Sequence, residues 1–159
     1  FEGSNKEYLE LLVKEVFPKL KADDLANRID IFVEQSAFSV EEGDYFLNEA
    51  KNQGFEITIH ADQFTAGGSY LATKYKALSA DHLEFSSEEE VKNLANSNVV
   101  ATVLPGASIG LGMQYAPARK LLDAGCCVSI ASDSVSVFTC LEASPVLISF
   151  LKGNNIAEL

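Results

Sequence analysis

The stretch Ile57-Thr58-Ile59-His60-Ala61-Asp62 indicates the fold, because it is a short apolar run that ends on residues able to bind a metal. The runs Leu78-Ser79-Ala80-Asp81-His82-Leu83-Glu84 and Cys127-Val128-Ser129-Ile130-Ala131-Ser132-Asp133 have the same form. In parallel α/β folds the carboxyl ends of the strands form one face, and that face carries the active site. The three runs therefore predict a metal-dependent hydrolase whose ligands come from separate strands.

Around these runs, apolar strands alternate with helix patterns along the chain. Capping boxes at Ser4-x-x-Glu7, Ser39-x-x-Glu42 and Ser86-x-x-Glu89 predict the starts of three helices. Helices are expected at 4–20, 39–54, 69–76, 86–96, 117–125 and 141–151, with a glycine-containing loop at 105–115. Strands are expected at 29–33, 56–60, 77–81, 98–104 and 126–132.

The connections between the five expected strands carry helices, which requires parallel strands with right-handed crossovers. The strands are apolar on both faces, as burial beneath helices requires. Two architectures fit these parallel (β/α) units: a doubly wound open sheet and part of an eight-stranded TIM barrel. A whole barrel needs about 200–250 residues or more, whereas the chain has 159. A barrel origin would therefore make the chain a single partial (β/α) barrel domain without the first strands.

Composition limits the partners that the chain is expected to bind. Its net charge of −11 argues against nucleic acid and against anionic membranes, since both attract basic patches. It has neither an 18-residue apolar stretch nor a signal segment. Cys126, Cys127 and Cys140 form an odd set without CxxC spacing, which is typical of buried thiols in a reducing compartment. We expect a cytoplasmic protein, and we expect a segment upstream of Phe1 to be absent from the sequence.

Each of the three runs supplies one residue that could work in a metal site. A neutral imidazole at His60 suits zinc or iron, and the alternative is a hydrogen-bonded structural histidine. His82 could act as a general base or stabilise charge on a carbonyl oxygen, with the same alternative. Asp133 could bind metal and accept a proton from metal-bound water, or it could cap a helix. Because the same position recurs on three strands, a shared site is favoured.

Other candidates give weaker signals. The segment 105–110 lacks both GxGxxG and the Walker lysine, so it is interpreted as a turn with a substrate-facing loop. Gly67 and Gly68 are interpreted as backbone flexibility at a helix start. Glu34 ends a strand, where it either lines the site or lies on a solvated rim.

Five motifs, in their order along the chain, resemble those of imidazolonepropionases, which are members of the amidohydrolase superfamily. They are Asp30-Ile31-Phe32-Val33-Glu34 with Ala37-Phe38-Ser39, His60-Ala61-Asp62-Gln63, the run 78–84, Leu104-Pro105-Gly106-Ala107 and Ala131-Ser132-Asp133. The resemblance extends from Phe1 to about Asp133. The combination of the second, third and fourth motifs is specific, although each motif alone is not.

This resemblance implies the C-terminal half, about strands 4–8, of a TIM-like barrel with one divalent zinc or iron ion. It implies hydrolysis of the cyclic amide 4-imidazolone-5-propanoate to N-formimino-L-glutamate in histidine degradation. His60 and Asp133 would bind the metal, and His82 and Asp133 would be catalytic. Gln63 falls where many members have a catalytic or water-orienting Glu; as an amide it cannot be a base, so a positioning and substrate-binding role is expected. Ser134 would contact substrate, and the full-length protein would be a homodimer.

The chain also departs from the family pattern. The family's His-x-His metal pair, and its substrate-binding Arg, Tyr and third-strand His, would precede Phe1. Beyond Asp133 the family usually has Asn-Pro-Gly, whereas this chain has Val135-Ser136-Val137-Phe138, so the substrate pocket is expected to differ. Two alternatives therefore stay open. One is a catalytically incomplete half-barrel, a fragment or assembly module with exposed sheet edges. The other is a different amidohydrolase, such as a deaminase or another cyclic amidase.

Overall fold

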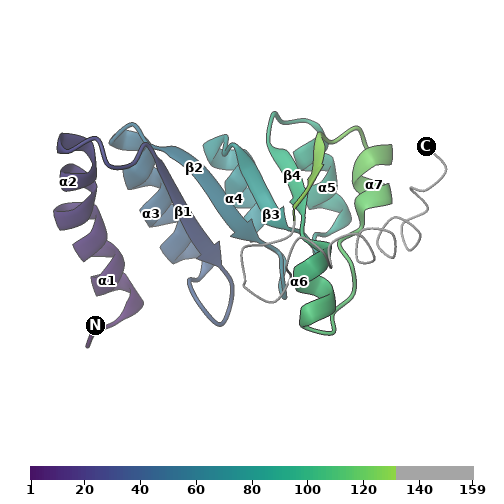
Figure 1. The fold of residues 1–159 in the computed structure, drawn as a ribbon, viewed down its shortest axis with the longest axis horizontal. Helices are drawn as coiled ribbons and strands as arrows, with labels where there is room; N and C mark the ends of the chain where they lie inside the picture. The colour runs from purple at the N-terminus through teal and green to yellow at the C-terminus, as the bar shows by residue number, and fades with distance from the viewer. Residues whose placement is uncertain (132–159) are drawn as a thin grey trace.

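The computed structural model describes residues 1–131, which form one parallel sheet with helices packed against it (Figure 1). The strands are β1 (Arg28–Val33), β2 (Glu56–Ala61), β3 (Ser79–His82), β4 (Val100–Val103) and β5 (Val128–Ile130). All four strand pairs are parallel, and the strand order is β1-β2-β3-β4-β5. The predicted helix 141–151, and with it Asp133, Ser134 and Cys140, lies outside the described residues.

The strand order decides between the two predicted architectures. A doubly wound sheet reverses its direction of growth, so its first strand lies inside the sheet. Here every strand is added beside the previous one, and right-handed crossovers then place the connecting helices on one face. Figure 1 shows α3 (Val40–Asn52), α4 (Gly68–Tyr75) and α5 (Glu88–Ala95) together behind the sheet. The arrangement is that of consecutive units of a barrel.

The N-terminal segment and the two short helices complete the described part. Residues 5–22 form α1 (Asn5–Leu11), the π-helical turn η1 (Leu12–Val16) and α2 (Phe17–Ala22), where a single helix to residue 20 was predicted. The short α6 (Pro105–Gly110) occupies the start of the predicted loop 105–115, which corrects that prediction. Proline suits the first turn of a helix, because the missing N–H is not needed there. The last helix is α7 (Ala118–Asp123).

The predicted capping boxes are confirmed at Ser4 and Ser39, but the third is wrong by one residue. Helix α5 is capped by Ser87, whose side chain accepts from the Glu90 amide while Glu90 accepts from the Ser87 amide. Two serines precede two glutamates at the same spacing, so the sequence alone allows both registers. Ser86 instead donates to the buried carboxylate of Asp62, 2.7 Å away.

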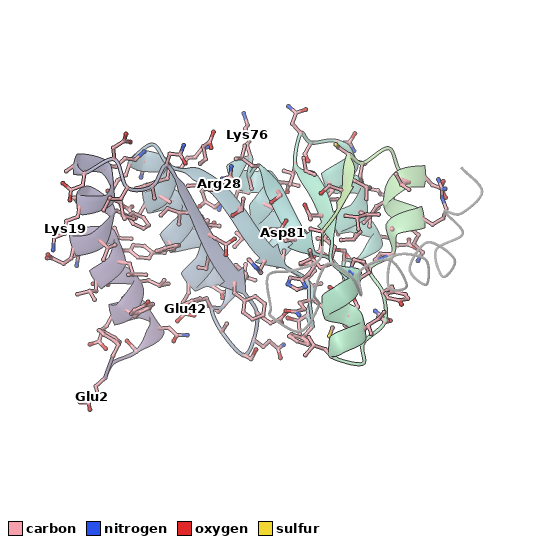
Figure 2. The ribbon with its side chains drawn as sticks, in the orientation of Figure 1. Glu2, Lys19, Arg28, Glu42, Lys76 and Asp81 are labelled. Carbon is pink, nitrogen blue, oxygen red and sulfur yellow. The ribbon has the colours of Figure 1, made fainter. Side chains whose placement is uncertain are left out.

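Only one face of β1 is buried, which corrects the expectation of strands apolar on both faces. Ile29, Ile31 and Val33 point into the core beneath the helices, whereas Arg28 and Asp30 are exposed on the other face. Figure 2 shows the side chains of the labelled Arg28 and Asp81 on the sheet. The face opposite the helices therefore carries polar groups.

Gly68 is required at the start of α4 for a steric reason that was not predicted, and the N-cap Gly67 for its backbone conformation. A Cβ on Gly68 would lie 2.8 Å from the Cα of Ala61, so the helix start packs directly on β2. Gly67 has φ +129°, a conformation that L side chains rarely adopt. Both residues hold the loop after His60 close to the sheet.

Candidate active site

His60 lies near the carboxyl end of β2, where its side chain reaches the polar face of the sheet. It stands opposite Phe32 of β1 and Asp81 of β3 in the strand register. Its Nδ1 lies 2.8 Å from Oδ2 of Asp30. The other oxygen of Asp30 accepts a hydrogen bond of 2.9 Å from the hydroxyl of Thr58. The Asp30 carboxylate is thereby oriented towards the imidazole.

Asp30, His60 and Asp81 form a group of possible metal ligands. One nitrogen or oxygen atom from each residue lies within 4.8 Å of the others. One imidazole with two carboxylates is a donor set that suits zinc or ferrous iron. All three side chains are partly exposed, so an ion could reach them from solvent. The residues present therefore fit the divalent metal that the sequence implies.

His82 ends β3, beside Ala61 of the neighbouring strand, and is almost completely buried. Its ring centroid lies 5.5 Å from that of His60, with the ring planes tilted by 46°. The backbone has φ 87° at His82 and φ 70° at Leu83. Two consecutive residues in this rarely adopted region indicate local strain, which is common at functional sites. The two histidines are thus brought together, as the sequence predicts.

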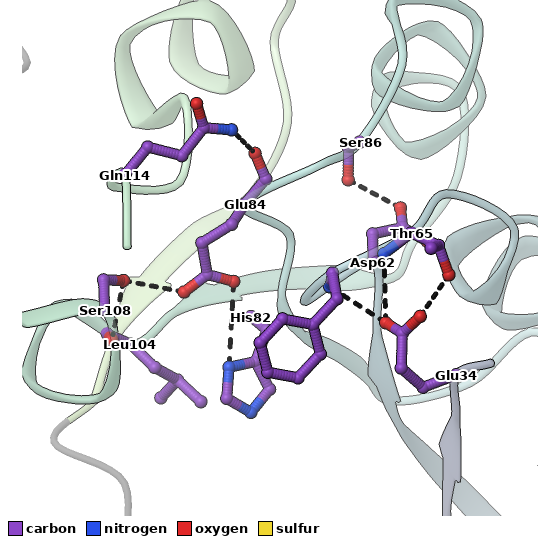
Figure 3. A network of polar contacts seen from close by, with 10 residues as sticks. Glu34, Asp62, Thr65, His82, Glu84, Ser86, Leu104, Ser108 and Gln114 are labelled. Atoms are coloured by element: carbon purple, nitrogen blue, oxygen red, sulfur yellow. Dashed lines mark hydrogen bonds and ion pairs between the residues drawn. The ribbon is translucent and has the colours of Figure 1, made fainter. Parts of the chain in front are cut away.

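Glu84 lies next to His82 and is buried as well (Figure 3). Its Oε2 is 3.7 Å from Nδ1 of His82, and its Oε1 accepts a 2.7 Å hydrogen bond from the hydroxyl of Ser108 in α6. The side-chain amide of Gln114 donates to the Glu84 carbonyl oxygen at 2.8 Å. Ser108, in the segment 105–110, and Gln114 thus support Glu84. The substrate-facing role predicted for 105–110 stays a prediction.

The loop that follows His60 is held from one side by Asp62. This buried carboxylate accepts hydrogen bonds from the amides of Gly67 and Ser69, at 3.0 and 3.1 Å, and from the hydroxyls of Ser69 and Ser86. Burial raises the pKa of Asp62, and the hydrogen bonds from Ser69 and Ser86 offset part of that increase. Asp62 therefore has a structural role in this loop.

Glu34, at the end of β1, holds the same loop from the other side (Figure 3). It accepts from the amides of Phe64 and Thr65, at 2.9 and 3.1 Å, from the Thr65 hydroxyl and from the Gln35 amide. Burial alone would raise the pKa of Glu34, but these hydrogen bonds outweigh it and hold the pKa below its ordinary value. Glu34 is therefore neither a solvated rim residue nor free to ligate.

Gln63 lies between these two carboxylate anchors and is 7% exposed. Its backbone neighbours on both sides are fixed, Asp62 by its own contacts and Phe64 by Glu34. This rigid attachment is suitable for the positioning role that is predicted for Gln63, and that role stays a prediction.

The remaining predicted residues, Asp133 and Ser134, lie outside the described residues. Three residues near the histidines were not singled out from the sequence: Asp30, Asp81 and Glu84. The alternation of side chains along β1 could have indicated Asp30. Residues two positions apart lie on the same face of a strand, and Phe32, two residues after Asp30, stands opposite His60. Asp81 and Glu84 flank His82 in sequence, but nothing in the sequence indicates which of them contacts it.

Comparison with solved structures places the fold in a class. The chain superposes with a TM-score of 0.62 on an adenosine deaminase from Xanthomonas campestris with bound zinc, at 15% identity, over 92% of this chain and 38% of that one. It superposes with a TM-score of 0.58 on a guanine deaminase from C. acetobutylicum, at 19% identity, over 76% of this chain and 33% of that one. The chain thus has the fold of part of a TIM-like barrel, as predicted.

Sequence comparison gives the particular relatives. The chain is 39% identical to the imidazolonepropionase of Parabacteroides distasonis over 151 residues, which are 94% of this chain and 36% of that protein. It is 40% identical to the imidazolonepropionase of Streptococcus gordonii, over 84% of this chain and 44% of that protein. No protein-family model matches the chain. The predicted resemblance to a part of imidazolonepropionase is confirmed, and the chain spans less than half the length of these relatives.

Proposed function

We propose that this chain supplies the His60 and His82 part of an imidazolonepropionase active site. The assembled site would hydrolyse the ring amide of 4-imidazolone-5-propanoate to give N-formimino-L-glutamate. One observation carries the proposal: the rings of His60 and His82 lie 5.5 Å apart at the ends of neighbouring strands, and His60 lies among two carboxylates. The relatives that match almost the whole chain are imidazolonepropionases, which supports this substrate over that of a deaminase.

His60, with Asp30 or Asp81 beside it, would hold a zinc or iron ion, and Asp133 is the further ligand predicted from the sequence. When bound, such an ion lowers the pKa of a coordinated water towards about 7, which supplies the nucleophile. The family-implied His-x-His pair would complete the ligand set.

The chain's own side chains would then move protons and orient the ring. Hydrolysis adds hydroxide to the ring carbonyl carbon and a proton to the departing ring nitrogen. His82 would stabilise the charge that develops on the carbonyl oxygen, as an imidazolium that donates from its ring. Asp133 would take the proton of the attacking water and return it to that nitrogen, while Gln63 and Ser134 would orient the substrate.

A chimera tests this proposal directly. The matched 151 residues of the Parabacteroides distasonis protein would be replaced by the corresponding residues of this chain. The chimera should open the imidazolone ring in the presence of zinc or ferrous iron, and His82→Ala in the chimera should reduce kcat by about 10²-fold or more. A chimera that folds and binds metal but does not open the ring, while the parent does, would overturn the proposal.

The alternative, a catalytically incomplete half-barrel, is favoured by the exposed polar face of β1. A ring-opening assay on the 159-residue chain itself distinguishes the two readings. Activity of the chain alone with added metal contradicts the incomplete half-barrel, whereas activity of the chimera only supports it.

Assembly and location stay predictions. No helix among residues 1–131 is long and apolar enough to cross a membrane. The expected homodimer and the expected cytoplasmic location await a sedimentation measurement and cell fractionation.

A further inference from the structure

We propose that Glu84 is a positioning residue that fixes the orientation and tautomer of the His82 imidazole. Its Oε2 faces Nδ1 of His82 at 3.7 Å (Figure 3). Within residues 1–131 neither atom has a hydrogen-bond partner, and the two side chains are 3% and 0% exposed. This inference deepens the proposed function, and it rests on that function for the catalytic role of His82.

The burial of both atoms is the physical reason for the pairing. A buried polar atom without a partner is destabilising, so two such atoms that face each other gain by forming a hydrogen bond. A separation of 3.7 Å is longer than a hydrogen bond, but catalytic contacts are often long until substrate binds. A carboxylate offers only acceptors, so the hydrogen must be on Nδ1 of His82.

Glu84 is itself held in place at its other oxygen. The hydroxyl of Ser108 donates to Oε1 at 2.7 Å, and the Gln114 amide fixes the backbone carbonyl of Glu84 at 2.8 Å. Ser108 lies in α6, which follows β4 directly, so the next strand along the sheet supports the carboxylate. One oxygen of the Glu84 carboxylate therefore faces Ser108, and the other faces His82.

The consequence for His82 concerns its second ring nitrogen. Nε2 lies on the side of the ring away from Glu84 (Figure 3). With the hydrogen on Nδ1, Nε2 is an acceptor in the neutral ring, and in the imidazolium form it is the nitrogen that can donate to the carbonyl oxygen of the substrate. A carboxylate that holds one nitrogen of a histidine while the other reacts is the arrangement found in catalytic triads.

Nitrogen-15 NMR of the imidazoles tests the assignment on the 159-residue chain without metal or substrate. The chain has two histidines, so His60→Ala assigns both sets of signals. In spectra recorded at a pH of about 8, Nδ1 of His82 should carry hydrogen. In Glu84→Gln the amide can donate to Nδ1, so Nδ1 should lose its hydrogen in a large share of molecules.

Glu90→Gln is the matched control, because Glu90 is also buried but caps α5, where Gln is an equally good partner. It should leave the His82 spectrum unchanged. If Glu84→Gln fails to fold, Ser108→Ala replaces it and should give a mixture of tautomers. The proposal is overturned if Nδ1 of His82 lacks hydrogen in the wild type, or if a folded Glu84→Gln or Ser108→Ala chain keeps the wild-type tautomer. An inactive chimera with the expected tautomer would contradict only the proposed function.

Discussion

At the scale of single residues, the two histidines of the chain have different surroundings, and these differences suggest different roles. His60 is 38% exposed in its side chain and lies among carboxylates that suit a metal. His82 is buried and faces one carboxylate, Glu84. The chain thus offers a test in which each histidine is the control for the other.

Zinc binding should depend on His60 and not on His82. His60→Ala removes the only nitrogen ligand of the described group and should weaken zinc affinity at least about tenfold, since even the loss of an outer partner costs 10–100-fold. His82→Ala should change the affinity by less than about threefold. Calorimetric titration at neutral pH, with the zinc-dependent rise in Tm as a second readout, measures both. Equal losses in the two variants would contradict the assignment of His60.

The carboxylate of Glu34 should make the stability of the chain depend on pH. Its hydrogen bonds hold the pKa below the ordinary 4.5 in the folded state. Its contribution is therefore present above pH 4.5 and is lost as the pH falls through the folded-state pKa. Glu34→Gln should lower the free energy of unfolding by about 1–2 kcal/mol at pH 7, and this difference should shrink as the pH falls below 4.5. Urea unfolding of both proteins across that range checks it, and a difference independent of pH would contradict it.

At the scale of secondary-structure elements, the start of α4 packs directly on the backbone of β2. Gly68→Ala would place a Cβ 2.8 Å from the Ala61 backbone, which cannot move without disturbing β2. The change should cost about 1–3 kcal/mol, as overpacking usually does. Thermal or urea unfolding measures the cost.

Gly43→Ala in α3 is the control for this change. There the new Cβ would meet the ends of the Leu71 and Val33 side chains, at 2.9 and 3.0 Å, and these can rotate. Alanine also favours the helix interior by up to about 1 kcal/mol relative to glycine. Gly43→Ala should therefore lower the free energy of unfolding clearly less than Gly68→Ala. The reverse order would show that the contact with the Ala61 backbone does not determine the loss of stability.

Much of the element order was predictable, because local signals set it. Apolar runs, serine caps and glycine ends placed all five strands and most helices, with errors of a few residues at the ends. The third capping box shows the limit: Ser86 and Ser87 offer equal local signals, and a long-range hydrogen bond from Ser86 to Asp62 selects the register. The pairing of His60 with His82 was predictable from strand ends. The anchors Glu34 and Glu84 were not, because which buried donors surround a carboxylate depends on loop paths.

At the scale of the whole molecule, the central strands and the edge strands of the described sheet should differ in their protection from hydrogen exchange. Strand β3 is paired on both sides, whereas within residues 1–131 β1 pairs only with β2. Amides of β3 should therefore exchange with deuterium more slowly than those of β1, because local opening is easier at an edge. Exchange followed by mass spectrometry at two protein concentrations measures this order. Equal protection that does not change with concentration would contradict the edge position of β1.

The left-handed backbone at His82 and Leu83 has a further consequence, for mutational tolerance. Asparagine, aspartate and histidine tolerate positive φ better than other side chains, and glycine adopts it freely. A library randomised at position 82 and selected for folding alone should return this small set, with β-branched residues depleted. Selection for ring opening should narrow it to histidine. Position 82 would then be restricted by two requirements: a residue that tolerates positive φ, and the imidazole that ring opening needs.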